Sequence, residues 1–155
     1  MKKFLFVEVL AMASIMSYAQ PRAIGARLGY GAMFSYEHQV GQNMVDLEVG
    51  VPGFSTLEAA CTYDWIDPFG AVVPWNEKGE WHWYMGVGGA FRADWYGAAG
   101  FAGVAGRFGI EYDFWFPLQL SLDWRPCIGV TNAYANWFNV GGLYEGITLD
   151  VRYKF

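Results

Sequence analysis

The last nine residues of the chain, 147–155, read ITLDVRYKF, and apolar and polar side chains alternate along them without a break. The odd-numbered positions, from Ile147 to Phe155, are all apolar or aromatic, whereas the even-numbered positions hold Thr, Asp, Arg and Lys. Because successive side chains of a β-strand point to opposite sides of a sheet, this period of two predicts a strand with one apolar and one polar face. The stretches RFGIEYDF (107–114) and LQLSLDWR (118–125) alternate in the same way.

Similar alternation recurs along the chain, and no helical periodicity competes with it. Read as single runs, the segments number seven, but single-chain bacterial outer-membrane barrels have an even number of strands. We divide the run from Ala23 to Gln39 at Gly29–Tyr30–Gly31, which can supply the backbone angles of a tight turn. The sequence thus predicts an all-β fold, an eight-stranded antiparallel transmembrane β-barrel of up-and-down meander topology, over residues 20–155. The expected strands are 23–30, 32–39, 44–51, 55–66, 81–93, 103–114, 118–128 and 146–155.

Composition points the same way. A chain of 155 residues is long enough for one domain. Hydrophobic residues make up 54% and charged residues only 16%, against roughly 25% charged in an average soluble domain, which argues against a soluble enzyme. The formal charge of -5 gives no footprint for nucleic acid. Two cysteines exclude a disulfide scaffold and a four-cysteine zinc site.

The N-terminus resembles a secretory signal peptide, 1–19. Lys2 and Lys3 precede an apolar run over 4–15, and small residues follow up to Ala19. The alternative is an N-terminal anchor helix, although the run is short for a bilayer span. No apolar stretch of 18 or more residues follows it, which excludes helical membrane spanning of the remaining chain. We therefore expect an exported protein.

The placement of charged residues indicates which face of each predicted strand points into the barrel and which points outward. A soluble lipocalin-like barrel also alternates, but with its apolar side chains inside. Here only two lysines, Lys78 and Lys154, follow the signal peptide, although a soluble exterior normally carries many. We therefore expect the polar parity to face a narrow lumen and the apolar parity to face lipid. The polar parity holds all fifteen charged residues of the predicted strands: Arg27, Glu37, Asp46, Glu48, Glu58, Asp64, Arg92, Arg107, Glu111, Asp113, Asp123, Arg125, Asp150, Arg152 and Lys154.

These inward charges predict an ion-pair network that fills the lumen, because unpaired charges in a narrow interior would be costly. Its expected members are Arg27, Glu48, Glu58, Arg92, Arg107, Glu111, Asp123, Arg125, Asp150 and Arg152. Placed by depth, Arg27, Arg92, Arg107 and Arg125 lie with Glu48 and Glu58 toward the outside. Asp46, Asp64, Asp113, Arg152 and Lys154 lie toward the periplasm.

The signal peptide, the passage YDFWFPLQLSLDWRP (112–126) and the ending LDVRYKF (149–155) together resemble the small OmpX-like outer-membrane β-barrel proteins. The resemblance covers essentially all of residues 20–155. It implies location in the outer membrane of a Gram-negative-type bacterium, contact with outer-membrane lipids and lipopolysaccharide, and a C-terminal signal, here Tyr153 and Phe155, for the barrel-assembly machinery. Members of this family are variously proposed as structural, adhesive or defence-related proteins.

A periplasmic C-terminus places the expected connections. Toward the cell exterior these are 129–145, 94–102, 52–54 and the turn at Gly29–Gly31; toward the periplasm they are 115–117, 67–80 and 40–43, of which 67–80 is long for a periplasmic turn. The longest outer loop, 129–145, contains Tyr134, Trp137 and Phe138. We expect this aromatic and polar mixture either to bind an extracellular ligand or to lie solvated against lipopolysaccharide.

Catalytic residues are scarce. Ser35 lies near Glu37 and His38, but Ser35 and His38 fall on opposite faces of their strand, and both His38 and His82 map to the periplasmic end. The sequence therefore predicts no enzyme, no cofactor and no metal site. It favours a structural or surface-binding, adhesive role in the outer membrane, with an outer-membrane lipid-modifying enzyme or a narrow pore as alternatives.

Overall fold

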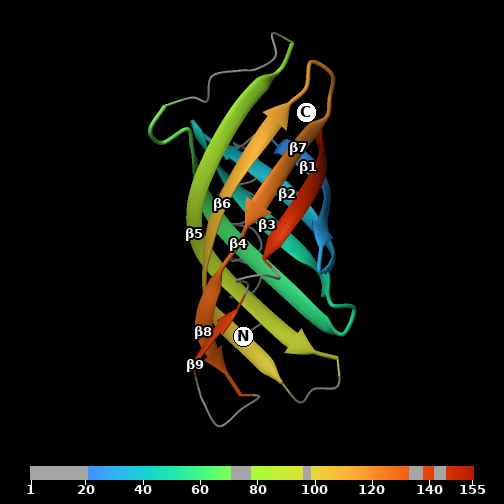
Figure 1. Ribbon diagram of the computed structural model, residues 1–155, viewed down its shortest axis with the longest axis vertical. Helices are drawn as coiled ribbons and strands as arrows, with labels where there is room; N and C mark the ends of the chain where they lie inside the picture. Colours follow the sequence, from blue (N-terminus) through green and yellow to red (C-terminus); the bar gives the residue numbers. More distant parts are fainter. Residues whose placement is uncertain (1–20, 71–77, 96–98, 133–137, 142–145) are drawn as a thin grey trace, which may run out of the picture.

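The computed structural model describes residues 21–70, 78–95, 99–132, 138–141 and 146–155 (Figure 1). The predicted signal peptide, 1–19, lies outside the described residues, as do Tyr134 and Trp137 of the expected binding loop. None of the described residues belongs to a helix that is long and apolar enough to cross a membrane.

The described chain is all β, with strands joined in sequence as a meander. Neighbouring strands pair antiparallel, and β1 also pairs with β10, from Ala23 opposite Lys154 to Leu28 opposite Leu149, which closes the sheet. β7 and β8 together form the seventh barrel strand, and β9 and β10 the eighth, so the predicted closed eight-stranded barrel is confirmed. The strands are β1 (Pro21–Gly29), β2 (Gly31–Val40), β3 (Asn43–Pro52), β4 (Thr56–Ile66), β5 (Glu80–Asp94), β6 (Gly100–Asp113), β7 (Gln119–Trp124), β8 (Cys127–Thr131), β9 (Phe138–Gly141) and β10 (Ile147–Lys154).

The division of the first long run at glycine is also confirmed. β1 ends at Gly29 and β2 begins at Gly31, leaving Tyr30 alone in the turn. Gly31 has a φ of 140°, which L-residues with a side chain rarely adopt. A Cβ at this position would also meet the backbone of Val51 and Pro52 on β3. Glycine therefore permits the reversal that two full strands require.

The expectation of one continuous seventh strand over 118–128 is wrong in detail. The ladder is interrupted at Arg125 and Pro126, because proline has no N–H to donate. The Pro126 carbonyl still accepts a hydrogen bond from the Gly106 N–H at 2.8 Å. The register on β6 is unchanged across the interruption, so the strand continues in the same direction.

The expectation of a single outer loop over 129–145 is wrong as well. β8 extends to Thr131, and β9 occupies four residues within this segment. On the seventh barrel strand, Trp124 pairs with Ile147 of the eighth. Cys127 lies three positions after Trp124, but its partner, Gly141, lies six positions before Ile147. The eighth strand thus carries extra residues where it passes Pro126. β9 has only four residues, and alternation over so few residues cannot distinguish a strand from a loop in the sequence.

We call the end of the barrel that holds the C-terminus the inner end and the opposite end the outer end (Figure 1). The outer end is uneven. β5, β6, β8 and β9 extend to one end of the molecule, opposite the end where the C-terminus lies (Figure 1). β1 pairs with the eighth strand only as far as Leu28 opposite Leu149. Within the described chain, β9 pairs with β8 alone.

The two faces of the barrel are the reverse of those of a soluble protein. On β10, Asp150 is fully buried and Arg152 nearly so, while Leu149 and Tyr153 are about half exposed. The largest fully buried side chains of the described chain are mostly charged. The buried apolar cluster is small, consisting of Ala60, Ala90, Ala105 and Cys127. Polar side chains therefore fill the interior, and apolar side chains cover the outside.

Candidate functional site

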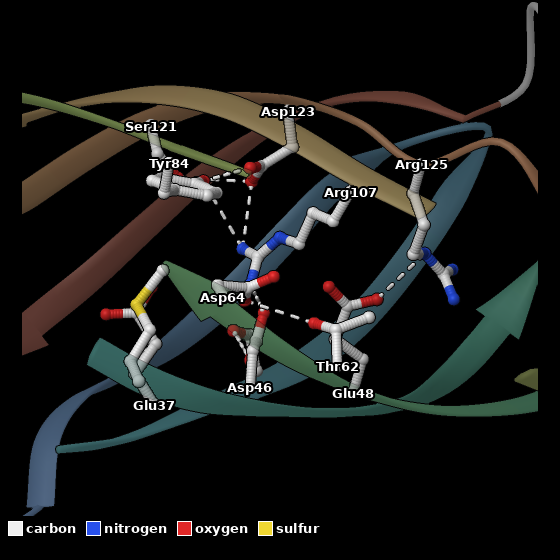
Figure 2. Close-up of polar contacts among 12 residues, drawn as sticks. Glu37, Asp46, Glu48, Thr62, Asp64, Tyr84, Arg107, Ser121, Asp123 and Arg125 are labelled. Carbon is white, nitrogen blue, oxygen red and sulfur yellow. Dashed lines mark hydrogen bonds and ion pairs between the residues drawn. The ribbon is translucent and has the colours of Figure 1, made fainter. Parts of the chain in front are cut away.

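The barrel interior holds a continuous set of charged side chains, part of which is drawn in Figure 2. Each of the ten residues expected in the network has an oppositely charged partner within 4.0 Å. Seven cations and nine carboxylates contribute in total. The cations are Arg22, Arg27, Arg92, Arg107, Arg125, Arg152 and Lys154, and the carboxylates are Glu37, Asp46, Glu48, Glu58, Asp64, Glu111, Asp113, Asp123 and Asp150.

Arg107 is at the centre of the interior (Figure 2). Its guanidinium group donates to the Asp64 carboxylate at 2.8 Å and to the Asp123 carboxylate at 3.2 Å, and it also pairs with Asp46. The ring of Tyr84 lies 4.8 Å from the guanidinium carbon, a cation–π distance, and the Tyr84 hydroxyl donates to Asp123. The side chain of Arg107 is completely buried, so these contacts replace its hydration.

Two glycines make this cluster possible. A Cβ at Gly86 would collide with the Asp64 carboxylate, and a Cβ at Gly109 would collide with Asp123 and the Tyr84 ring. Both glycines lie on strands β5 and β6 at positions that face the lumen. The narrow barrel therefore has room for large polar side chains because glycine occupies the opposing positions.

Arg152 forms a second buried centre beside Arg107. Its Nη1 atom lies 3.2 Å from the Glu37 carboxylate and donates to the Ser121 hydroxyl at 2.7 Å. Its Nε atom donates to the Ser35 hydroxyl at 2.8 Å, and its Nη2 atom pairs with Asp150. Ser35 is thus a structural partner of an arginine rather than a neighbour of His38.

The placement of Arg107 by depth was wrong. Arg107 was expected with the outer group, but it contacts Asp46 and Asp64, which were assigned to the periplasmic group. The long arginine side chain reaches along the barrel from its own Cα, so depth read from the backbone position misplaces its charge.

The inner end contains a cation that sequence analysis missed. Arg22 donates to Glu37 at 2.6 Å and pairs with Glu111, while Lys154 pairs with Asp113 at 2.5 Å. Arg22 precedes the predicted first strand, which begins at residue 23, and it lies on the parity opposite to that of Arg27. The pairing of β1 with β2 shifts register between Pro21 and Ala23, and such a bulge redirects a side chain to the other face. No signal in the alternation marks this bulge.

The outer end has a different balance of charge. Arg27 pairs with Glu48, and Arg125 lies 3.2 Å from the same carboxylate (Figure 2). Arg125 also pairs with Glu58, which accepts from Arg92 at 2.6 Å. Three guanidinium groups therefore share two glutamates. Beside them is a cavity of about 200 Å³.

The remaining predicted residues are on the exterior. Tyr153 and Phe155 are 54% and 65% exposed, and their rings are 5.3 Å apart in an edge-to-face arrangement. The Phe155 N–H donates to the Arg22 carbonyl at 3.0 Å, which joins the chain end to β1. Of the expected binding loop, Phe138 belongs to β9, and its side chain is outside the described residues.

The histidines do not form a hydrolytic triad with a described hydroxyl group. His38 Nδ1 is 3.0 Å from the Tyr36 hydroxyl, not near Ser35. His82 Nδ1 is 2.6 Å from the Asp67 carboxylate, and its Nε2 is 3.6 Å from Glu80. Within the described ranges, no group of three or more His, Cys, Asp or Glu side chains is arranged to hold a metal ion.

Comparison with known proteins identifies no relative of the chain. No family model, no curated protein and no solved structure matches the chain.

Proposed function

We propose that the protein is an integral outer-membrane β-barrel of a Gram-negative-type bacterium, with a structural or surface-binding role and no catalytic activity. One observation carries this proposal: the charged residues of the barrel are buried and its apolar residues are exposed. In water this arrangement would be unfavourable, because a large apolar exterior promotes association. In a bilayer the same exterior contacts hydrocarbon, and the closed sheet satisfies its own backbone hydrogen bonds.

The distribution of exposed aromatic residues supports membrane insertion. Trp115 and Phe155 are more than 60% exposed near the end of the barrel where the C-terminus lies. Tyr30 and Phe54 are exposed in the turns at the opposite end. Aromatic side chains favour the two membrane–water interfaces, and membrane barrels carry a belt of them at each interface.

The filled interior favours a structural role over a pore. Arg107, Arg152 and Tyr84 are almost completely buried at the centre of the lumen, and cavities of about 200 and 650 Å³ lie at the two ends of the barrel. Continuous conduction needs a water path along the axis, and long side chains cross it here. An eight-stranded barrel has an interior just wide enough for side chains to fill.

A surface-binding role is supported by the projecting edge. β9 has one unpaired side within the described chain, and the exposed Val130 and Val140 lie nearby on β8 and β9. An extended segment of a partner could add to such an edge by main-chain hydrogen bonds. The expected partners are lipopolysaccharide, the barrel-assembly machinery during insertion, and an extracellular ligand.

The test is isolation from membranes followed by electrophoresis. We expect the mature protein to be extracted only by detergent, and to migrate differently when unboiled, because a folded barrel resists the gel detergent. Reconstituted protein should give no unitary conductance steps in planar bilayers. Recovery in the soluble fraction without detergent, with an unchanged band on boiling, would overturn the proposal. Steady single-channel steps would favour the narrow pore instead.

A further inference from the structure

The outer mouth of the barrel contains a cavity that is lined by both polar and apolar residues. It has a volume of about 200 Å³, and a second cavity of about 150 Å³ adjoins it along Thr56, Arg92 and Cys127. The lining of the first cavity includes Arg27, Met33, Glu58, Arg92, Arg125 and Thr148.

Positive side chains predominate around the first cavity. Its lining includes three arginines, Arg27, Arg92 and Arg125, but only one carboxylate, Glu58. The three arginines share Glu58 and Glu48 as partners. Two further carboxylates lie beside this group. Asp150 is 3.8 Å from Arg27 Nε and is bound more closely by Arg152 in the central cluster, and Asp94 lines the second cavity together with Arg92. The interior as a whole has more acids than bases. The predominance of cations is therefore local to the lining of the first cavity.

Two of these guanidinium groups also have nitrogen atoms without hydrogen-bond partners. Arg27 Nη2 and Arg125 Nη1 are buried and find no acceptor within the described chain. The exposed fractions of the two side chains are 1% and 7%. Figure 2 shows Arg125 bound to Glu48 through one nitrogen, with its terminal nitrogens directed away from that carboxylate. A buried donor without an acceptor is unfavourable, more so when the donor is charged, so an acceptor in the cavity would stabilise both groups.

We propose that the outer mouth is a binding site for a phosphate group, held by Arg27 and Arg125 with Arg92 at its rim. A guanidinium group is planar, permanently charged and suited to phosphate oxygens. A phosphate has enough oxygens to accept from two guanidinium groups at once, and its charge complements the cations that predominate in the lining. The phosphate can belong to a soluble molecule or to the headgroup of a lipid beside the barrel, since both present the same chemistry.

Calorimetric titration of the mature protein, refolded in an uncharged maltoside detergent, tests this site. One arm uses inorganic phosphate, and the other uses a short-chain phosphatidylglycerol. We expect saturable binding of one ligand per barrel in at least one arm. Arg125→Lys keeps the charge but removes the fork of donors, and it should weaken binding at least about tenfold. Arg22→Lys is the matched control at the inner end and should leave binding unchanged.

The two arms separate the sources. Binding of inorganic phosphate identifies a site for a soluble phosphate, whereas binding of phosphatidylglycerol alone, lost in Arg125→Lys, identifies a lipid headgroup site. Absence of saturable binding in both arms at millimolar ligand overturns the proposal, as does equal weakening by Arg125→Lys and Arg22→Lys. If Arg125→Lys does not refold, Ser55→Trp replaces it. This substitution fills the cavity from its exposed rim without touching an ion pair, and it should abolish binding, while unchanged binding would count against the site.

Discussion

At the scale of single residues, almost every buried charge of the described interior has more than one partner. Arg107 contacts Asp46, Asp64 and Asp123, and each of these carboxylates would be left without its closest cation if the arginine were removed. A buried ion pair adds little relative to a well-packed apolar pair, but breaking one by removing a single partner costs about 3–5 kcal/mol. The network therefore specifies one arrangement of the lumen more than it raises stability.

Replacement of Arg107 by Met should destabilise the barrel by at least about 3 kcal/mol, because buried carboxylates lose their cation. Arg92→Gln is the matched control. The Arg92 side chain is 32% exposed, and Glu58 keeps Arg125 as a partner, so this substitution should cost less than about 1 kcal/mol. Urea unfolding of refolded protein, followed by loss of the fast-migrating folded band, measures both. Similar midpoints for the two variants would contradict the central role of Arg107.

The cysteines should remain reduced within one molecule even in an oxidising compartment. Cys61 on β4 is exposed on the outer face, whereas Cys127 on β8 is buried, and strands β5 and β6 separate them. A disulfide requires Cα atoms within about 7 Å and side chains that point toward each other. Mass measurement of the unreduced, folded monomer should give the mass of two free thiols. A loss of two hydrogens would contradict the strand assignment.

The inward position of charge could be predicted residue by residue, because alternation assigns a face to each strand position. Arg22 escaped this reasoning, since a bulge near Pro21 reverses the parity of the chain. The partners of each arginine were also beyond prediction, because a long side chain selects among several carboxylates according to packing. Sequence periodicity indicates the face of a residue, but its contacts require the closed barrel.

At the scale of elements, the strands with long, regular alternation were predicted within a few residues, and those interrupted by proline or added residues were not. β10 and β4 follow the expected pattern along their whole length. β7 and β8 are separated at Pro126, and β9 is only four residues long. The extension of β8 and β9 at the outer end was therefore missed, and with it the edge of β9 that has no partner strand within the described chain.

The last strand provides a prediction for assembly. Deletion of Phe155 should lower the amount of folded protein in outer membranes, because the terminal aromatic residue is the expected signal for insertion. Refolding from urea into detergent should persist, since the Phe155 side chain is 65% exposed and the strand pairs of β10 stay intact. Phe54→Ala, which removes an exposed aromatic side chain at the other end, is the control and should change neither quantity. Equal membrane levels for all three proteins would refute the role of Phe155.

At the scale of the whole molecule, the orientation of the two faces determines every other conclusion. A barrel with buried arginines and exposed leucines is favourable only if its outer surface contacts hydrocarbon. The alternation predicts a two-faced sheet but is symmetric between a soluble and a membrane barrel. The low lysine content favoured the membrane barrel, and the burial of Asp150 beside the exposed Leu149 agrees with that choice.

The decisive measurement is therefore where an outward-facing position lies relative to lipid. Leu122 is 53% exposed and pairs with Ile110 and Leu149 near the middle of the sheet. With both native cysteines replaced by Ala, Leu122→Cys should resist a water-soluble maleimide in reconstituted protein. A fluorophore attached there before refolding should be quenched by a probe within the acyl chains, because only a position against hydrocarbon meets that probe.

Phe54→Cys serves as the matched position outside the membrane, since Phe54 is 75% exposed in the turn between β3 and β4. It should react with the water-soluble maleimide and escape the acyl-chain quencher. The interior cannot give the pattern expected at position 122, because a side chain surrounded by protein meets neither reagent. If the fluorophore at position 122 is not quenched in folded, reconstituted protein, the apolar face does not contact lipid, and the proposed membrane location falls with it.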